Sequence, residues 1–310
     1  MQYLIPAIKV ARPVHWVKNF ALFAALIFTG QLLNQAAFIT VFWAFLAFNF
    51  ATSTTYIFND ILDVEHDRLH PIKKNRPIAH GDLSIPMAIF EAGILALVAW
   101  ALADSLSLVF SFLVLGYILL QVVYSLFLKN IAVIDILIIA SGFILRVYAG
   151  AFVINAHLSV WFLLCVVSVA LFLASGKRRA ELKVVDDPTQ TRKSLGRYPK
   201  DLLNSYVTMF GNAAWMSWAL FTFFESPRAS LKAWLFLAEF SKAATVNKLL
   251  MATVPLAIFC IMRYQSLIFA GKSEAPEKIL LTDIPLVSSV IIWTLLVVWI
   301  LYSGVSVAGI

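Results

Sequence analysis

The sequence predicts an all-α membrane protein that crosses the bilayer nine times. Of its 310 residues, 61% are hydrophobic and 13% are charged, whereas a soluble domain carries about 25% charged residues. The mean hydropathy is +0.87, and a spanning helix needs about 20 mostly apolar residues. Stretches of about this length are found at 17–34, 38–58, 84–103, 106–128, 131–154, 157–176, 202–224, 243–266 and 284–306.

Basic residues gather on one side of these predicted spans. With the N-terminus in the cytoplasm, 19 of the 24 Lys and Arg residues fall in cytoplasmic segments and four fall outside. Cytoplasmic loops of membrane proteins carry such an excess. The sequence therefore predicts a multi-pass protein of the cell membrane with its N-terminus inside and its C-terminus outside. The same placement gives the net charge of +7 a topological cause and argues against nucleic acid as a partner.

The chain reads as one membrane domain, 1–310, because no linker or low-complexity stretch separates the spans. The longer polar connections, about 59–83 and 177–201, fall on the cytoplasmic side. Most outer connections are minimal. We therefore expect the active-site loops on the cytoplasmic face of the membrane.

The segment "NDILDVEHDR", 59–68, ends the second predicted span with a cluster of acids. If 56–67 continues the span as a helix, Asp60, Asp63 and Asp67 lie within about 60° of one another, at about 100° per residue. Three such carboxylates repel one another unless a cation lies among them. Oxygen ligands of this kind suit Mg²⁺, which completes its shell with water and substrate phosphates. We expect Asn59 to help orient the bound group.

Basic residues follow the acids directly, with Lys73 and Arg76 in "HPIKKNRPIAHGDLS". Metal-binding carboxylates beside basic side chains suit a diphosphate, because the metal bridges its oxygens and the bases stabilise the leaving charge. The spacing alone also allows a second interpretation. Charged, solvated loops are common beside membrane spans.

The acid motif resembles N-D-x-x-D-x-x-x-D, which closes the second span in the UbiA superfamily of intramembrane prenyltransferases. The segment "YSLFLKNIAVIDILIIASGFILRVYAG", 124–150, also resembles this family's fourth and fifth helices. The resemblance covers nearly the whole chain. It implies a nine-helix bundle around a central cavity that opens to the cytoplasm, and Mg²⁺ held by the acids. It also implies that Lys18 and Asn19 face that cavity.

The second cytoplasmic connection departs from the common pattern of this superfamily. Most members carry another acidic motif there, but this chain reads "SGKRRAELKVVDDPTQTRKSLGRYPKD". Basic side chains bind phosphate directly by charge-assisted hydrogen bonds. The candidate phosphate-binding residues of the two loops and the first span are Lys18, Asn19, Lys73, Arg76, Lys129, Lys177, Arg178, Arg192 and Lys193. Orientation of the chain and contact with anionic lipid remain an alternative role for the second loop.

Four segments carry a closer resemblance, to the decaprenyl-phosphate phosphoribosyltransferase branch. They are "RPVHWVKN" (12–19), "KRRAEL" (177–182), "TRKSLGRY" (191–198) and "RYQSLIFAGKSEAPEKILLTD" (263–283). This resemblance implies Mg²⁺-dependent transfer of 5-phosphoribose from phosphoribosyl diphosphate to a polyprenyl phosphate, as a step toward cell-wall polymers. The alternatives are a prenyltransferase that uses a prenyl diphosphate and a small acceptor, and a transporter. The single acidic motif argues against the first, and the rim position of the acids argues against the second.

Two charges fall inside the fifth predicted span. Asp135 and Arg146 are 11 residues apart, so they share a helix face about 16 Å apart. A charge in a span is costly and is usually paired or functional. Because the two are too distant to pair, each needs a partner on another helix, and Lys129 or Lys18 is the expected partner of Asp135. Residues assigned here to structural or cavity roles are Tyr124, Asp135, Arg146 and Glu181.

Overall fold

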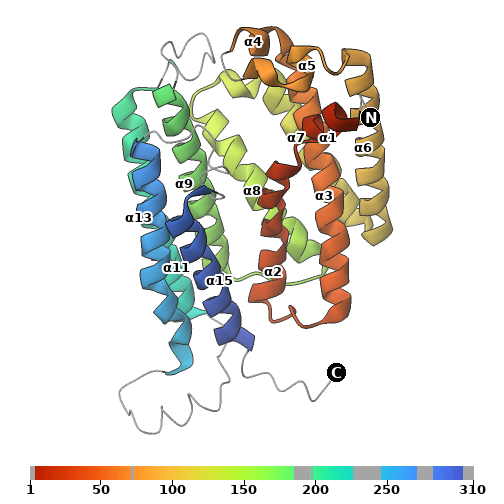
Figure 1. The fold of residues 1–310 in the computed structure, drawn as a ribbon. Helices are drawn as coiled ribbons and strands as arrows, with labels where there is room; N and C mark the ends of the chain where they lie inside the picture. The colour runs from red at the N-terminus through yellow and green to blue at the C-terminus, as the bar shows by residue number, and fades with distance from the viewer. Residues whose placement is uncertain are drawn as a thin grey trace. The chain divides into compact units, whose positions relative to one another are not determined.

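Helices make up every regular element in the described part of the chain, as the sequence predicts (Figure 1). The computed structural model describes residues 4–70, 73–184, 196, 198–225, 246–270 and 282–302. Arg192 and Lys193 lie outside these ranges. The chain divides into two compact units. The first unit comprises Met1–Leu26, Asn34–Ala156 and Val185–Pro199, and the second comprises Ile27–Leu33, His157–Val184 and Lys200–Ile310.

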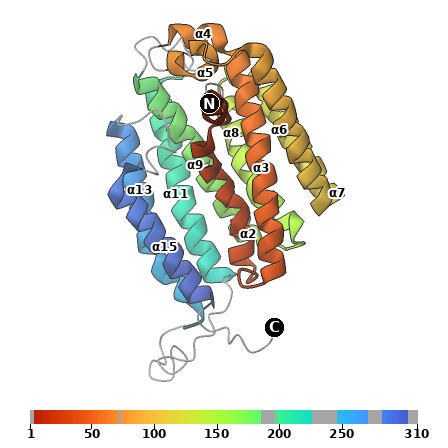
Figure 2. The ribbon, with the colours of Figure 1, turned by 45° about the vertical axis from the view of Figure 1, so that its right-hand side comes forward.

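The first unit holds the acid motif and both charged positions of the fifth predicted span. Its elements are α1 (Leu4–Ala11), η1 (Pro13–Leu22), α3 (Gln35–Leu62), α4 (Val64–Leu69), η2 (Lys73–Asn75), α5 (Pro77–His80), α6 (Ile85–Leu106), α7 (Leu108–Leu126), η3 (Leu128–Asn130) and α8 (Ile134–Val153). The division between the units falls inside α2 (Phe23–Phe28). Helix α3 packs along α6 and also contacts α7 (Figure 2).

The second unit is built on a pair of long helices. It contains α9 (Val160–Val184), α11 (Lys200–Phe224), η5 (Val246–Thr253), α13 (Val254–Ala270) and α15 (Ile284–Tyr302). Helix α9 packs along α11. Phe172, Val207, Tyr264, Ile268 and Leu286 form a buried core that joins four of these helices.

Seven helices in the described residues are long and apolar enough to cross a membrane. They match seven of the nine predicted spans. The stretch 17–34 is divided between η1 and α2, and η1 is a 3₁₀-helix of 10 residues. The stretch 202–224 lies within the longer α11, whose polar side chains include Asn204, Thr208 and Asn212. Nine spans and a cavity that opens to the cytoplasm stay predictions.

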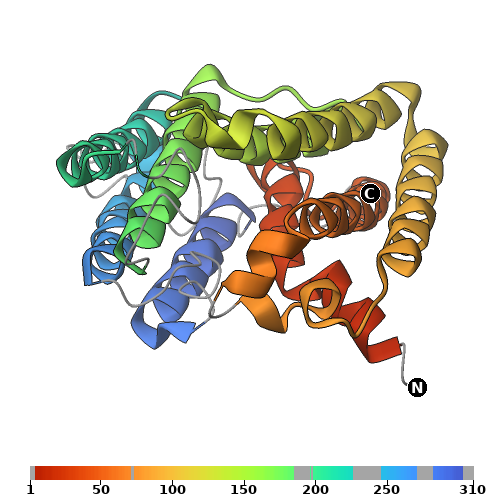
Figure 3. The same ribbon diagram turned by 90° about the horizontal axis from the view of Figure 1, so that it is seen from above.

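Helix α3 ends earlier than the continuous 56–67 helix that the sequence predicts. It begins after Asn34, whose side chain accepts a hydrogen bond from the Ala37 N–H, and its last residue is Leu62. Asp63 has φ −94° and ψ 5°, and α4 starts at the next residue. Figure 3 looks down on this end of the first unit, where α4 and α5 follow α3. The turn at Asp63 therefore interrupts the helix between Asp60 and Asp67.

Candidate active site

A small hydrophobic cluster fixes the loop that follows the acid motif. Ile78 and Leu83 are buried in it against Val10 of α1 and Ile57 of α3. The loop turns back through Gly81, whose φ of +98° is in the left-handed region that glycine adopts without strain. Burial of these apolar side chains holds Arg76, just before α5, beside the end of α3.

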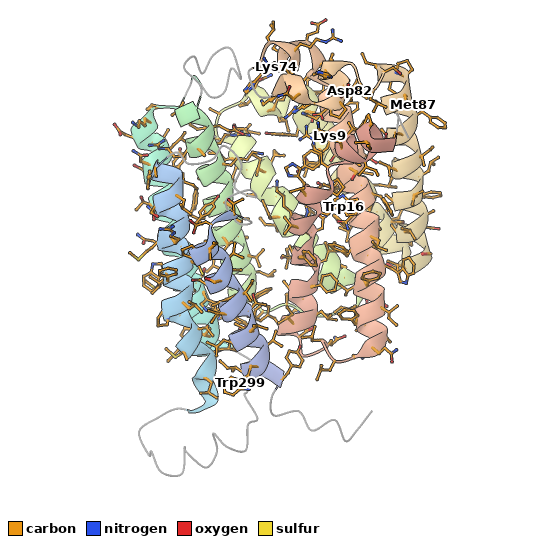
Figure 4. All side chains as sticks on the ribbon, in the orientation of Figure 1. Lys9, Trp16, Lys74, Asp82, Met87 and Trp299 are labelled. Atoms are coloured by element: carbon orange, nitrogen blue, oxygen red, sulfur yellow. The ribbon has the colours of Figure 1, made fainter. Side chains whose placement is uncertain are left out.

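Charged residues cluster at this end of the first unit. Figure 4 shows Lys9, Lys74 and Asp82 at the end that carries α4 and α5, with Trp16 further along η1. The side chains of Lys9, Lys74 and Asp82 are exposed. Asp60 and Asp67, in contrast, are only 2% and 3% exposed. A buried carboxylate is costly unless it is paired and hydrogen-bonded, so the partners of these two side chains define the site.

Arg76 joins the first and third aspartates of the motif. Its Nη1 donates to Asp60 Oδ1 at 3.0 Å and to Asp67 Oδ2 at 2.5 Å. Burial raises the pKa of the Asp67 carboxyl above its ordinary value, although the charge and hydrogen bond of Arg76 act in the opposite direction. The sequence prediction that Asp60 and Asp67 share a face agrees with this arrangement.

Arg12 is a second partner of Asp60, which the sequence reasoning missed. Its Nη2 lies 2.5 and 2.7 Å from the two carboxylate oxygens, and its guanidinium carbon lies 5.1 Å from the centre of the Tyr56 ring. Arg12 adopts a left-handed conformation, with φ 53° and ψ 60°. Ser53 holds the preceding residue by donating to the Ala11 carbonyl at 2.7 Å. The sequence feature that could have pointed to this contact is a basic residue directly before a proline, in "RPVHWVKN".

Asp63 has different partners. Lys129 Nζ donates to its Oδ1 at 2.5 Å, and Asn59 Nδ2 donates to its Oδ2 at 3.0 Å. The three aspartates therefore do not converge on one point. Within the residues described here, no three His, Cys, Asp or Glu side chains are grouped so that they could hold one metal ion.

Two of the carboxylates nevertheless fit a divalent cation. Oxygens of Asp60 and Asp67 both contact the same nitrogen of Arg76, so a positive charge already lies between them. Mg²⁺ is usually bound by one or two carboxylates together with water and substrate phosphates. This donor set has the required chemistry. Asp63 would join it only after a change in its contact with Lys129.

A buried polar network holds η1 behind the acid cluster. Arg146 donates through Nε to Asn19 Oδ1 at 2.5 Å, through Nη2 to Tyr117 Oη at 2.7 Å, and through Nη1 to the Gly142 carbonyl at 2.5 Å. Asn19 in turn donates to Asn49 Oδ1 of α3 at 2.6 Å. These partners of the Arg146 guanidinium, all in the described part of the chain, are neutral. Arg146 thus links α8 to η1 and α7, and it fixes the residue next to Lys18.

The other predicted positions of the first unit have separate environments. Asp135 accepts a hydrogen bond from Tyr198 Oη at 2.6 Å, whereas Lys18 Nζ lies 3.5 Å from Tyr56 Oη. Lys73 is half-buried in η2, and Tyr124 is buried in α7. Tyr198 is a contact that the sequence did not predict, because 63 residues separate it from Asp135.

The start of the second predicted loop is helical. Helix α9 extends to Val184, so Lys177 and Arg178 lie on its last turns. Arg178 is fully buried and forms an ion pair with Glu181, which is three residues further along the helix. Arg179 is also buried, and its Nε donates to Asn204 Oδ1 of α11 at 2.6 Å. Lys177 is half-buried. These three adjacent basic residues thus have different environments: Lys177 is half-buried, Arg178 is paired with Glu181, and Arg179 is bonded to Asn204.

The family of this chain follows from its sequence match. A family model described as "UbiA prenyltransferase family" matches residues 19–224. The chain belongs to the UbiA prenyltransferase family. The matched range includes the acid motif, the Lys129 turn and α8, so the UbiA resemblance of the motif is confirmed.

Curated relatives of this UbiA-family transferase are similar over most of its length. A decaprenyl-phosphate phosphoribosyltransferase of Corynebacterium glutamicum is 37% identical over 95% of this chain and 86% of the relative. A protein of the same name from Mycolicibacterium smegmatis is 35% identical over 89% of this chain and 86% of the relative. A third, from Mycobacterium tuberculosis, is 31% identical over 97% and 94%.

Solved structures of UbiA proteins share the fold. A UbiA homolog from Archaeoglobus fulgidus bound to GPP and Mg²⁺ matches with a TM-score of 0.65 at 18% identity, over 97% of this chain and 100% of that chain. A digeranylgeranylglyceryl phosphate synthase matches with a TM-score of 0.60 at 15% identity, over 98% and 99%. At these identities the likeness supports the fold of the UbiA-family transferase and not its substrates.

Proposed function

We propose that this UbiA-family transferase moves 5-phosphoribose from 5-phosphoribosyl 1-diphosphate to a polyprenyl phosphate and releases pyrophosphate. The observation that carries the proposal is the buried cluster of Asp60 and Asp67 with Arg12 and Arg76. Such a cluster suits a diphosphate, because it supplies both carboxylates and guanidinium groups. The names of the three relatives, at 31–37% identity, support the identity of the sugar donor and the lipid acceptor.

We assign Mg²⁺ binding to Asp60 and Asp67, with Asp63 as a third ligand that Lys129 holds before substrate enters. When bound, the metal neutralises the charge that develops on the departing pyrophosphate. Arg12 and Arg76 both contact Asp60 Oδ1. Their guanidinium groups then face the diphosphate oxygens and stabilise the leaving group by charge-assisted hydrogen bonds.

The reaction needs no general base on the protein. A phosphate monoester carries a charge of about −1.5 to −2 at pH 7, so the lipid phosphate oxygen is already a nucleophile. That oxygen forms a bond to the anomeric carbon of the ribose while the bond from this carbon to the diphosphate oxygen breaks. The electron pair of the broken bond leaves with pyrophosphate. The role of the chain is to bind, orient and stabilise charge.

Basic residues outside the acid cluster are assigned to the remaining phosphates. Lys73 and Lys129 lie in the same unit as the acids, and Lys18 adjoins the Arg146 network. Lys177, Arg192 and Lys193 belong to the second loop, where this chain lacks an acidic motif. We assign this loop to the 5-phosphate of the sugar or to the phosphate of the lipid. The site would face the cytoplasm, with the N-terminus inside.

A donor competition assay tests the proposal directly. The purified protein in detergent is incubated with radiolabelled phosphoribosyl diphosphate, polyprenyl phosphate and Mg²⁺. We expect the label in the lipid phase and release of pyrophosphate. A parallel reaction with geranyl or farnesyl diphosphate and 4-hydroxybenzoate is the comparison. Pyrophosphate release from that reaction alone would favour the prenyltransferase alternative.

A further inference from the structure

A tyrosine that ends the second loop is anchored at the start of α8. Tyr198 is buried, and its hydroxyl donates to Asp135 Oδ1 at 2.6 Å. The same hydroxyl accepts a hydrogen bond from the Val133 N–H. One oxygen atom thus holds both the backbone before α8 and the side chain in its first turn. All three residues belong to the first unit.

The backbone at this anchor is strained. Val133 has φ 70° and ψ −47°, which is close to the rare γ-turn conformation. A positive φ is unusual for a β-branched residue and persists only where the surroundings enforce it. The carbonyl of Val133 accepts from the N–H groups of Ile136 and Leu137 inside α8. Its N–H, however, is bonded by Tyr198, so this side chain is the external restraint on the turn.

The strained turn lies between Lys129 and α8. Lys129 is in η3, which follows α7 directly, and the Ile131 N–H bonds the carbonyl of Leu128 at the end of η3. Val133 follows two residues later, so its dihedral angles contribute to the direction of η3 relative to α8. At the far end of this turn, Lys129 Nζ contacts Asp63 Oδ1 at 2.5 Å. Tyr198 is therefore linked to the acid motif by its hydrogen bond to Val133, by the backbone from Val133 to Lys129, and by the contact of Lys129 with Asp63.

We infer that Tyr198 is a positioning residue, whose hydroxyl keeps the Val133 turn in the form that holds the Lys129 ammonium beside the acid motif, where it can bind a substrate phosphate. The inference rests on the proposed function, because Lys129 is assigned there to a substrate phosphate. It gives a physical reason for the buried charge of Asp135, which orients the tyrosine hydroxyl. The donor proton of that hydroxyl points to Asp135, so Tyr198 acts through the turn and not on the substrate.

The first test compares Tyr198→Phe with Tyr206→Phe. Tyr206 lies in α11 of the second unit, and its ring centroid is 6.3 Å from that of Phe210, so it serves as the control tyrosine. Tyr198→Phe should raise KM for phosphoribosyl diphosphate about tenfold, the effect of losing about 1.4 kcal/mol, with a smaller change in kcat. Tyr206→Phe should leave both unchanged. A wild-type KM in Tyr198→Phe would overturn the inference.

Two double variants distinguish a positioning role of Tyr198 from direct contact with the substrate. Glycine adopts positive φ readily, so Val133→Gly in the Tyr198→Phe protein should restore most of the lost affinity. In a Lys129→Gln background, Tyr198→Phe should add little, because residues that act as one unit are not additive. Absence of restoration, or a full tenfold effect on top of Lys129→Gln, would contradict action through the turn.

Hydrogen–deuterium exchange provides a readout that does not depend on activity. Exchange in the segment 128–135 should become faster in Tyr198→Phe than in the wild type or in Tyr206→Phe, because the Val133 N–H loses its partner. Unchanged exchange would overturn the inference even if no substrate were turned over. A wild-type protein that does not use phosphoribosyl diphosphate would refute the proposed function separately.

Discussion

Arg12 places a single nitrogen, Nη2, at 2.5 and 2.7 Å from the two carboxylate oxygens of Asp60. The two residues are 48 positions apart, and Asp60 is 2% exposed. Arg76 shares one of these oxygens. This buried carboxylate therefore has two guanidinium partners.

Replacement of Arg12 tests this relationship. Arg12→Gln should lower kcat/KM about tenfold to hundredfold, the range expected when a charge-assisted hydrogen bond of about 1.5–3 kcal/mol is lost. Arg12→Lys should recover only part of the loss, because Lys keeps the charge but lacks the planar fork. Lys9→Gln, at an exposed position of α1, is the control. Equal kinetics in Arg12→Gln and Lys9→Gln would exclude a functional role for the Asp60 contact.

Removal of the motif carboxylates should abolish turnover without unfolding the protein. Asp63→Ala and Asp67→Ala each delete a proposed ligand, and Glu65→Ala, at an exposed position of α4, is the matched control. Turnover by the wild type should also require a divalent cation. We would measure product formation across a Mg²⁺ titration and in excess chelator, together with thermal unfolding. Full activity in chelator would remove the metal from the proposal.

The acid motif was predictable because its signal is local. Asp60 and Asp67 are seven residues apart, a spacing that predicts one helix face; the turn at Asp63 interrupts that helix, but Arg76 still contacts both carboxylates. The partner Arg76 lies in the next loop, and nearby basic residues were part of the prediction. Arg12 was not foreseen as a partner, because its contact with Asp60 depends on the left-handed turn before Pro13 and on packing of α1. Periodicity carries no information about either.

The break within the first predicted span was not predicted for a similar reason. Its apolar composition satisfies the length rule, but η1 contains Asn19, which is buried and bonded to Arg146 and Asn49. A mean hydropathy over about 20 residues hides a single polar residue such as Asn19. The segment forms a 3₁₀-helix, and the partners of Asn19 come from positions 30 and 127 residues away. The sequence therefore predicts that Arg146 has a partner on another helix, but it does not identify that partner as Asn19.

Helix α8 packs so closely against η1 at Gly150 that there is no room for a side chain at this position. A Cβ added there would lie 2.0 Å from the Leu22 carbonyl oxygen, so the backbone of one element must move. Overpacking of this kind costs about 1–3 kcal/mol or more, and Gly150→Ala should lower Tm. Gly93→Ala, in α6, is the matched control because nothing lies within 4 Å of its added Cβ. That control should be neutral or slightly stabilising, since Ala favours the helix. An unchanged Tm in Gly150→Ala would contradict the close approach.

Lys177 and Arg178 are adjacent in the chain, but the structure predicts different consequences for their loss. Arg178 is fully buried and paired with Glu181, so Arg178→Gln removes the buried cation of this ion pair. Breaking such a pair is destabilising, and we expect a lower Tm as the main effect. Lys177 is half-buried. Lys177→Gln should keep the wild-type Tm and, if this residue binds phosphate, raise KM for one substrate.

Thermal unfolding and Michaelis constants for both substrates separate these outcomes. Arg192→Gln and Arg192→Lys extend the comparison to the loop beyond α9, where the loss of the planar fork tests direct phosphate binding. Arg178→Gln with an unchanged Tm and a raised KM would mean that Arg178 leaves Glu181 to bind substrate. Wild-type KM values in Lys177→Gln and in both Arg192 variants would instead limit this loop to membrane orientation, because the remaining basic residues preserve the inside charge. The sugar phosphate would then have to be bound by Arg12, Lys18 and Lys129.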